Sequence, residues 1–436
     1  MKNLIKQRLA DAVSMDIPEI VEREFRLPNI PNKTHAVIGM RRTGKTYFLF
    51  QKIKQYLSEE IDQSRLVYFN FEDERLAEMT SKELHWITDE YYVLYPENMS
   101  RKVYFFFDEI QMVKGWEVFT RRLMDNENVQ IFISGSSAKL LSREIASSMR
   151  GRSIETIIYP YSYREFLKIQ GIDYPSSPAR ANKQQRNHLA NRFLKYLLEG
   201  GFPEAQGLEN RDRHLLLQGY VNMVLFRDII DRFNISNTMV LKKLIRHLIS
   251  NAGTHFTVNK FFNYLKSQGM KVAKTTLYEY LDHIQDAFLL FPVHIYTDSE
   301  RKRMLNPIKP YIIDTGLTSA FSTKQEPDSG KLLENNVFVE LKRRQAEISY
   351  MRTSSGYEVD FIARYPDGRV QAIQVSADVS NPQTLERECR SLREICSLLP
   401  EAELILVNLS EESEIKVINK RYIVVLPAWK WMLSGF

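Results

Sequence analysis

The chain has 436 residues, of which 44% are hydrophobic and 26% are charged, and its formal net charge at pH 7 is +6. These values are ordinary for a globular protein of about two to four domains, and the sequence has no apolar run of the roughly 18 residues that a membrane span requires. We therefore expect no membrane association and a cytoplasmic protein with Cys389 and Cys396 as reduced thiols; the slight basic excess permits a polyanionic partner without indicating one.

The first predicted helix covers residues 1–13, and its many charges do not fit a signal peptide. A short apolar strand follows at residues 35–38, and residues 47–57 have the apolar spacing of a helix. Between them, residues 39–46 read Gly-Met-Arg-Arg-Thr-Gly-Lys-Thr and complete the pattern G-x-x-x-x-G-K-[ST]. Strand, glycine-rich loop and helix in this order are typical of a phosphate-binding P-loop.

Each residue type in this loop has a chemical reason. Glycines let backbone N–H groups approach a polyphosphate, and the helix that begins near Gly44 directs its positive dipole end at the phosphates. The ammonium group of Lys45 would contact the β- and γ-phosphates, and the hydroxyl of Thr46 would bind Mg²⁺. The sequence therefore predicts a nucleoside triphosphate with Mg²⁺ at this loop.

Two carboxylates follow the apolar run at residues 102–107. Asp108 and Glu109 stand where a core strand ends, which is the edge at which open α/β sheets bind their ligands. We expect Asp108 to hold Mg²⁺, usually through water, and Glu109 to orient and activate the attacking water. A solvated turn is the alternative for such a pair, but the preceding loop favours catalysis.

Polar residues also follow two other predicted strands. Residues 72–74, Glu-Asp-Glu, end the strand at residues 65–71. A position near the nucleotide is one interpretation of this acidic cluster, and a solvated turn is the preferred one. Ser134 follows the buried strand at residues 129–133. Its hydroxyl could sense the γ-phosphate by hydrogen bonding to it or to the adjacent water, and ordinary turn chemistry is an equally good alternative.

Two arginines come next along the chain, Arg150 and Arg152. A guanidinium from the same chain or from a neighbouring subunit can neutralise the charge that develops on the γ-phosphate. We take these two residues as candidates for that role. A solvated basic turn is the alternative interpretation, since charge runs usually lie on the surface.

Six segments occur together in a characteristic order. They are Gly-Met-Arg-Arg-Thr-Gly-Lys-Thr, Phe-Asp-Glu-Ile-Gln-Met-Val-Lys-Gly-Trp-Glu, Ile-Ser-Gly-Ser-Ser-Ala-Lys-Leu-Leu-Ser, Arg-Gly-Arg, Tyr-Ser-Tyr-Arg-Glu-Phe and Glu-Gly-Gly-Phe-Pro-Glu. With them the chain resembles, over nearly its whole length, a family of prokaryotic AAA+-type ATPases that carry a C-terminal domain of unknown function with a restriction-endonuclease-like fold. The resemblance implies ATP as the nucleotide, with Asp108 and Glu109 as the second catalytic motif.

The predicted fold class is α/β, and the chain divides into four predicted parts. Residues 1–160 form an AAA+-like P-loop NTPase domain with a parallel sheet, and residues 161–235 form a helical lid. Residues 236–318 form a winged-helix domain, and residues 319–436 form a C-terminal α/β domain. The candidate nucleotide-binding residues are Gly39, Arg42, Thr43, Gly44, Lys45, Thr46, Asp108 and Ser134.

The winged-helix prediction rests on three short helices, at residues 240–251, 257–267 and 274–287, followed by two β-rich runs at residues 288–296 and 309–313. The third helix of such a fold can enter the major groove of DNA. Candidate nucleic-acid contacts are Lys271, Lys274, Thr275, Thr276, Tyr278, Tyr280 and, in the wing, residues 301–303. A module that packs against protein is the alternative.

The order of helices and strands after residue 319 suits a PD-(D/E)XK nuclease-like fold. Working versions need a helical glutamate, an aspartate on one strand and (D/E)-x-K on the next, so that carboxylates hold Mg²⁺ and lysine supports the attacking water. Glu340 and Asp360 match, but Gln374 and Ser376 stand in the third element. An amide is a weaker Mg²⁺ ligand and serine carries no charge, so we predict a degenerate site without cleavage.

Three functional hypotheses follow. The preferred one is a switch in which ATP binding and slow hydrolysis move the other parts, with DNA or a protein as the responding partner. An ATP-regulated, metal-dependent nuclease is the first alternative, and a nucleotide-stabilised scaffold without turnover is the second. The sequence leaves the oligomeric state open. An arginine that acts in trans would need a neighbouring subunit, and the sequence does not show whether Arg150 or Arg152 acts across an interface.

Overall fold

The computed structural model describes residues 1–436 with the exception of residues 29, 138–150, 323–326, 418–420 and 435–436. The chain forms two compact units. Unit 1 comprises residues 1–159 with residues 286–288, and unit 2 comprises residues 160–285 with residues 289–436. Among the described helices, none has both the length and the apolar character needed to cross a membrane.

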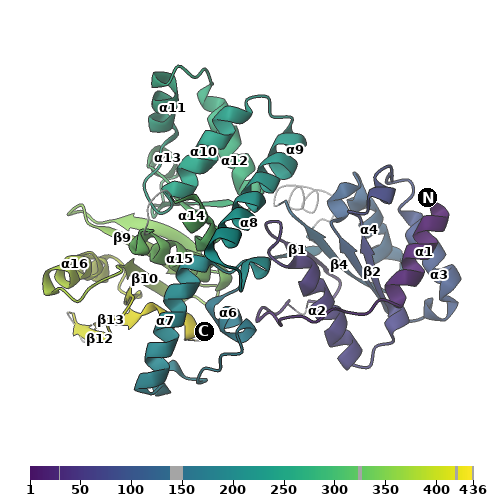
Figure 1. The fold of residues 1–436 in the computed structure, drawn as a ribbon, viewed down its shortest axis with the longest axis horizontal. Helices are drawn as coiled ribbons and strands as arrows, with labels where there is room; N and C mark the ends of the chain where they lie inside the picture. The colour runs from purple at the N-terminus through teal and green to yellow at the C-terminus, as the bar shows by residue number, and fades with distance from the viewer. Residues whose placement is uncertain (29, 138–150, 323–326, 418–420, 435–436) are drawn as a thin grey trace. The chain divides into compact units, whose positions relative to one another are not determined.

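Unit 1 is built on five parallel strands in the order β2-β3-β4-β1-β5 (Figure 1). The strands are β1 (Thr34–Ile38), β2 (Leu66–Asn70), β3 (Val103–Asp108), β4 (Val129–Gly135) and β5 (Ser153–Ile157), and the helices include α1 (Lys2–Val13), α2 (Lys45–Ser58), α3 (His85–Leu94) and α4 (Trp116–Asn126). Because all strands run the same way, their carboxyl ends share one edge. The end of β4 therefore lies between the ends of β1 and β3.

Aromatic and β-branched residues fill the core of this unit, as expected for strands that are covered on both faces. The rings of Phe106 on β3 and Phe132 on β4 are stacked with centroids 4.7 Å apart. Helix α2 packs Phe48 and Ile53 into the same cluster, next to Val37 of β1. The loop between β1 and α2 is thus fixed at both ends by buried residues.

Unit 2 begins with helices. They are α6 (Tyr163–Ile169), α7 (Lys183–Glu199), α8 (Asn210–Met223), α9 (Asp231–Phe233), α10 (Thr238–Ser250), α11 (Val258–Ser267) and α12 (Lys274–Asp286), and a π-helical segment, Val224–Ile230, joins α8 to α9. The helices predicted at residues 240–251, 257–267 and 274–287 are confirmed as α10, α11 and α12. Asp286 at the end of α12 belongs to unit 1.

The sheet of unit 2 has eight strands in the order β12-β13-β11-β10-β9-β8-β6-β7. The strands are β6 (Leu290–Ile295), β7 (Lys309–Ile312), β8 (Glu347–Arg352), β9 (Glu358–Arg364), β10 (Val370–Val375), β11 (Glu403–Asn408), β12 (Ser413–Lys416) and β13 (Tyr422–Pro427). The remaining helices are α13 (Glu300–Leu305), α14 (Thr315–Phe321), α15 (Ser329–Arg343), α16 (Pro382–Leu398) and α17 (Ala428–Leu433). Phe338 of α15 packs on Phe361, whereas Leu392 of α16 shares a core with Ile362. Neighbouring strand residues face opposite sides, so the two helices cover opposite faces of the sheet.

The hairpin predicted after the three helices forms, because β6 and β7 pair antiparallel. It is not an isolated wing, however, since β6 also pairs with β8 and so joins the larger sheet. The basic triplet at residues 301–303 lies in helix α13 and not in a loop, because Ser299 caps that helix by accepting a hydrogen bond from the Lys302 N–H. The winged-helix assignment and the four domain boundaries stay predictions.

Candidate active site

The loop between β1 and α2 has the backbone conformation that its glycines predict. Gly39 has φ +152° and Gly44 has φ +98°, both in the region that favours glycine. A Cβ on Gly39 would lie only 2.5 Å from the carbonyl oxygen of Ile158, so no larger residue fits there. The hydroxyl of Thr43 closes the loop by donating a hydrogen bond of 2.9 Å to the carbonyl of Met40.

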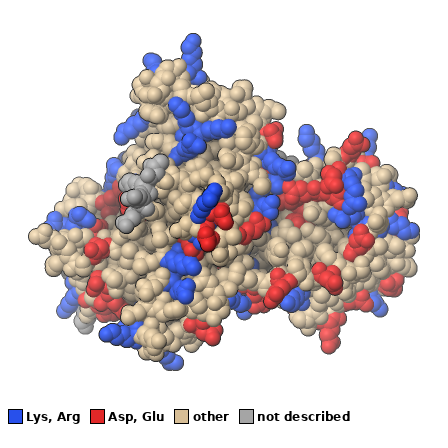
Figure 2. Space-filling model, viewed as in Figure 1, with Lys and Arg blue, Asp and Glu red and all other residues tan. Residues whose placement is uncertain are grey.

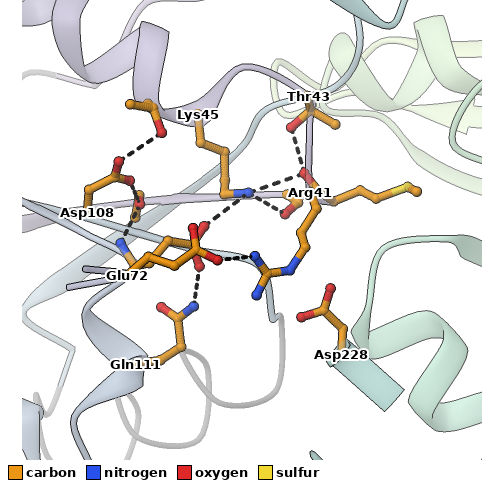
Figure 3. Close-up of polar contacts among 12 residues, drawn as sticks. Arg41, Thr43, Lys45, Glu72, Asp108, Gln111 and Asp228 are labelled. Atoms are coloured by element: carbon orange, nitrogen blue, oxygen red, sulfur yellow. Dashed lines mark hydrogen bonds and ion pairs between the residues drawn. The ribbon is translucent and has the colours of Figure 1, made fainter. Parts of the chain in front are cut away.

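Lys45, the first residue of α2, extends its side chain back over this loop (Figure 3). Its Nζ donates to the carbonyl oxygens of Gly39 and Met40, both at 3.2 Å, and lies 3.5 Å from Oε1 of Glu109. The side chain is only 5% exposed. A buried ammonium group with two neutral partners and one carboxylate is available to a more strongly charged ligand such as a triphosphate.

Asp108 ends β3 and accepts three hydrogen bonds from hydroxyl groups. Ser134 donates to Oδ1, while Thr46 at 2.8 Å and Tyr68 at 2.7 Å donate to Oδ2. Burial, followed by the charge of the adjacent Glu109, raises the pKa of Asp108 in spite of these bonds. Thr46 and Asp108 together present hydroxyl and carboxylate oxygens, which are the donors that Mg²⁺ takes beside phosphate and water.

Glu109 is held in a left-handed conformation with φ +54°, which is strained for a residue other than glycine. Its N–H donates to the Ser134 hydroxyl at 2.9 Å, and Gln111 donates to Oε2. Burial by itself raises the pKa of Glu109, but the positive charges of Lys45 and Arg41 outweigh burial and the net shift is downward. The carboxylate is therefore ionised at neutral pH and can accept a proton.

The structure brings together Lys45, Thr46, Asp108, Glu109 and Ser134, all of which the sequence selects. It adds contacts that the sequence analysis missed, namely the Tyr68 hydroxyl on Asp108, the Gln111 amide on Glu109, and an ion pair of 2.6 Å between Arg41 and Glu72. The solvated-turn interpretation of residues 72–74 is thus incomplete. The signal available for Tyr68 was a side chain with a hydroxyl group among the apolar residues Leu66, Val67 and Phe69 of β2.

Of the two candidate arginines, the structure describes only Arg152, which is not part of this cluster. Arg150 lies outside the described residues. Arg152 pairs with Asp125, and its carbonyl accepts from the N–H of Thr34 at the start of β1. The loop follows the other end of β1, about 13–16 Å away for a strand of this length. A contact between Arg152 and nucleotide within one chain therefore has no support, and the role of either arginine stays a prediction.

Family models match three consecutive parts of the chain: an AAA domain at residues 31–167, a domain of unknown function, DUF8612, at residues 190–328, and another, DUF4143, at residues 329–431. An uncharacterized protein of Methanocaldococcus jannaschii, MJ1544, is 33% identical over 425 residues, which cover 95% of this chain and 92% of that protein. The chain belongs to this AAA-domain family.

A second relative of this AAA protein, an uncharacterized protein of Haemophilus influenzae, is 32% identical over 350 residues, or 79% of this chain and 82% of the relative. Among solved structures, the Walker-type ATPase PABY2304 of Pyrococcus abyssi is 14% identical, with a TM-score of 0.42 over 74% of this chain and 95% of that chain. The AAA match and the parallel sheet make unit 1 a P-loop NTPase fold.

In the DUF4143 part, the predicted nuclease-like residues have different hydrogen-bond and ion-pair partners. Glu340 is bound by Arg344 at 2.9 Å and lies 3.5 Å from Arg343, and its nuclease-like role stays a prediction. The amide of Gln374 donates to Glu388 at 3.0 Å, and the Ser376 hydroxyl donates to the Asp378 carbonyl. These side chains are occupied by local partners.

Asp360 instead belongs to a cluster around Lys309, the first residue of β7. The ammonium group of Lys309 lies 3.0 Å from Asp360, 2.7 Å from Glu334 and 3.3 Å from Glu358. Tyr311 donates a hydrogen bond of 2.6 Å to Glu334. Glu334 and Glu340 are six residues apart on α15, which places them on different sides of the helix, and only the side that carries Glu334 faces this cluster.

The charges of this cluster are strongly coupled. Burial, followed by the charge of Asp360, raises the pKa of Glu334 to about 7. Burial also acts to raise the pKa of Glu358, but its hydrogen bond to His255 and the charge of Lys309 lower it to about 2. Within the described part of the chain no three His, Cys, Asp or Glu side chains are arranged to hold a metal ion. An ammonium group takes the central position among these carboxylates.

Proposed function

We propose that unit 1 binds ATP with Mg²⁺ and hydrolyses it. The observation that carries the proposal is the convergence of Lys45, Thr46, Asp108 and Glu109 at the carboxyl edge of one parallel sheet, with contacts of 2.8–3.5 Å among them. Binding and hydrolysis of a nucleoside triphosphate account for all of these groups at once: the ammonium group for the phosphates, the hydroxyl and one carboxylate for Mg²⁺, and the second carboxylate for the attacking water.

Each side chain has a defined task in this proposal. Lys45 exchanges its carbonyl partners for the β- and γ-phosphates, and the N–H groups of the loop surround the phosphate oxygens. Thr46 and Asp108 would hold Mg²⁺, whose charge would offset that of the phosphates. Glu109 orients the attacking water and takes its proton, and its lowered pKa keeps it ionised for that task.

Phosphate release and nucleotide binding, measured separately, test this proposal. Lys45→Ala is expected to lose most affinity for ATP, whereas the exposed Lys54→Ala on the same helix is the matched control and should bind as the parent does. Glu109→Gln is expected to bind ATP and to release phosphate orders of magnitude more slowly, with Glu74→Gln as its exposed control. Parental turnover by Glu109→Gln would refute the assigned role, and binding without turnover in the parent would indicate a scaffold.

The second part of the proposal is that nucleotide state is transmitted to another part of the chain. The Ser134 hydroxyl donates to the carboxylate of Asp108 and accepts from the backbone N–H of Glu109, and three residues later Ser137 donates to both carboxylate oxygens of Asp286, at 3.1 and 3.0 Å. Asp286 is the last residue of α12. A change at the γ-phosphate can thus reach α12 through a single short segment, and a nucleic acid or protein bound there would respond.

For unit 2 we propose that the DUF4143 part does not cleave nucleic acid. The support is the position of Lys309, which neutralises the carboxylates that a divalent cation would need. Supercoiled plasmid incubated with Mg²⁺ or Mn²⁺, with and without ATP, should stay intact. Nicking that is absent in Asp360→Ala but present in the exposed control Glu401→Ala would establish the nuclease alternative instead.

A further inference from the structure

The segment Thr238–Tyr278 contains seven lysines and arginines and not one aspartate or glutamate, although 54 of the 436 residues of the chain are acidic. It spans α10, α11 and the first residues of α12, and acidic residues return at Glu279. In Figure 2, Lys and Arg side chains are spread over the region that Figure 1 labels α10 and α11, and few Asp or Glu side chains lie among them. This part of unit 2 therefore carries charge of a single sign.

Three of these lysines gather where α11 turns into α12. The Lys274 Nζ lies 5.2 Å from the centroid of the Phe262 ring on α11. Lys266 is one helical turn after Phe262 and so lies on the same side of α11, and Lys271 lies in the connection between the helices. Tyr278, one turn after Lys274, is 54% exposed. We call Lys266, Lys271, Lys274 and Tyr278 the lysine surface.

The charge of the lysine surface has no counter-ion among the residues that the structure describes. Elsewhere in unit 2, Lys309 has three carboxylate partners and Lys195 has one. Exposed like charges that are gathered in this way repel one another, and an anionic partner relieves the repulsion. The surface is thus suited to a ligand with regularly spaced negative charges.

We propose that the lysine surface binds the phosphate backbone of a nucleic acid and that the ring of Tyr278 stacks on an unpaired base. Lysines neutralise phosphates without reading sequence, and an exposed ring accepts any base face. An acidic protein fits less well, because protein interfaces have an apolar core that is depleted in lysine, whereas the exposed residues beside this surface include the polar Asn263 and Gln268.

This mode differs from the insertion of α12 into a DNA groove. Tyr280 is only 3% exposed, and its hydroxyl reaches toward the backbone carbonyl of Asn237 at 3.4 Å, so it is not available to a ligand. Glu279 and Asp282 are exposed on α12 and would repel phosphates along the rest of the helix. Only the first turn of α12 therefore takes part, together with Lys266 and the connection.

Fluorescence anisotropy of the full chain with labelled 20-nucleotide single-stranded DNA, single-stranded RNA and duplex DNA, without nucleotide, tests the proposal. The variant with Lys266→Gln, Lys271→Gln and Lys274→Gln should bind at least tenfold more weakly than the parent. For single strands, the slope of log affinity against log salt concentration should be less steep than that of the parent by about 2, because three phosphate contacts are lost. A control with Lys6→Gln, Lys54→Gln and Lys82→Gln removes the same charge from exposed positions of unit 1 and should match the parent.

Tyr278→Ala should weaken binding to single strands at least fivefold, and Tyr278→Phe should retain parental binding, because stacking needs the ring and not the hydroxyl. Equal affinity and slope for the lysine variant and its control would overturn the proposal. Binding to poly-glutamate but to none of the three nucleic acids would also overturn it, in favour of an acidic protein. The binding assay contains no ATP, so its result is independent of the proposed hydrolysis, which is measured by phosphate release. The inference rests on the proposed function in one respect: it identifies the partner of the proposed switch as a nucleic acid.

Discussion

Lys309 provides the sharpest test of how unit 2 is stabilised. Its side chain is 4% exposed, so water screens little of its interaction with Glu334, Glu358 and Asp360. The substitution Lys309→Met keeps the length of the side chain and removes the charge. Removal of one partner of a buried ion pair costs about 3–5 kcal/mol, because the remaining charge stays buried without compensation.

The partners of Lys309 set the expected value within that range. Glu358 keeps His255 at 3.1 Å and Arg352 at 3.2 Å, and Glu334, whose pKa is already raised to about 7, can take up a proton. Asp360 is left with the Val375 N–H at 3.0 Å. One uncompensated carboxylate therefore remains, and we expect a loss near the lower limit, about 3 kcal/mol at pH 8, with a smaller loss at pH 6 where Glu334 is protonated.

Hydrogen exchange measured by mass spectrometry is the appropriate assay, because it reports each segment separately in a chain of two units. Amides of β7 and β9 should exchange about a hundredfold faster in Lys309→Met at pH 8, after correction for intrinsic rates, while β1 and β3 of unit 1 stay unchanged. Lys302→Met, an exposed lysine on α13, is the matched control. The addition of Asp360→Asn should restore part of the protection, and parental protection in the single variant would refute the reasoning.

Tyr68→Phe removes one of three hydroxyl donors to Asp108, the proposed Mg²⁺ ligand, so phosphate release should slow about two- to tenfold while equilibrium ATP binding stays within about threefold. Gly201→Ala places a Cβ 2.2 Å from a backbone carbonyl oxygen and should cost unit 2 at least about 2 kcal/mol in urea unfolding, whereas Gly219→Ala, with nothing within 4 Å, should be neutral or stabilising. The pKa of Glu334 is raised from 4.5 to about 7 in the folded state, so the stability that its protonation contributes is fully present below pH 4.5 and is lost as pH rises through 7. Glu334→Gln should therefore flatten the dependence of the unfolding free energy on pH between about 4.5 and 7. An unchanged pH dependence would contradict the raised pKa of Glu334.

The residues of the proposed nucleotide site could be selected from the sequence because they lie in short, continuous segments. Residues 39–46 contain the loop in one piece, and Asp108 and Glu109 directly follow an apolar strand. The parallel arrangement of the strands then brings both segments to one edge with no further information. What could not be read was which neighbours hold the carboxylates, since Tyr68 on β2 reaches Asp108 only through the pairing of β2 with β3, and the contact of Gln111 with Glu109 depends on the conformation of the turn after β3.

The cluster around Lys309 shows the opposite case. Glu334 and Glu340 are both glutamates of α15, and sequence spacing does not tell which side of a helix will face the sheet. The side that carries Glu340 is occupied by Arg344, whose guanidinium also lies 4.3 Å from the Trp431 ring centroid. Lys309 comes from a strand that joins the sheet through β6, so its place beside Asp360 is decided by long-range pairing alone. A lysine at the start of the buried run Lys309–Ile312 was the only local sign.

The hydroxyl of Ser134 limits what a γ-phosphate sensor can do in this site. A serine hydroxyl has one proton to donate, and here Ser134 donates it to Asp108 while accepting from the N–H of Glu109. It cannot donate to a phosphate oxygen and to Asp108 together. Sensing at Ser134 would therefore release an oxygen of Asp108 at the moment when that carboxylate is needed for Mg²⁺. The contacts of Ser134 join β4 to the end of β3 and are not those of a local turn, and phosphate sensing by this hydroxyl stays a prediction.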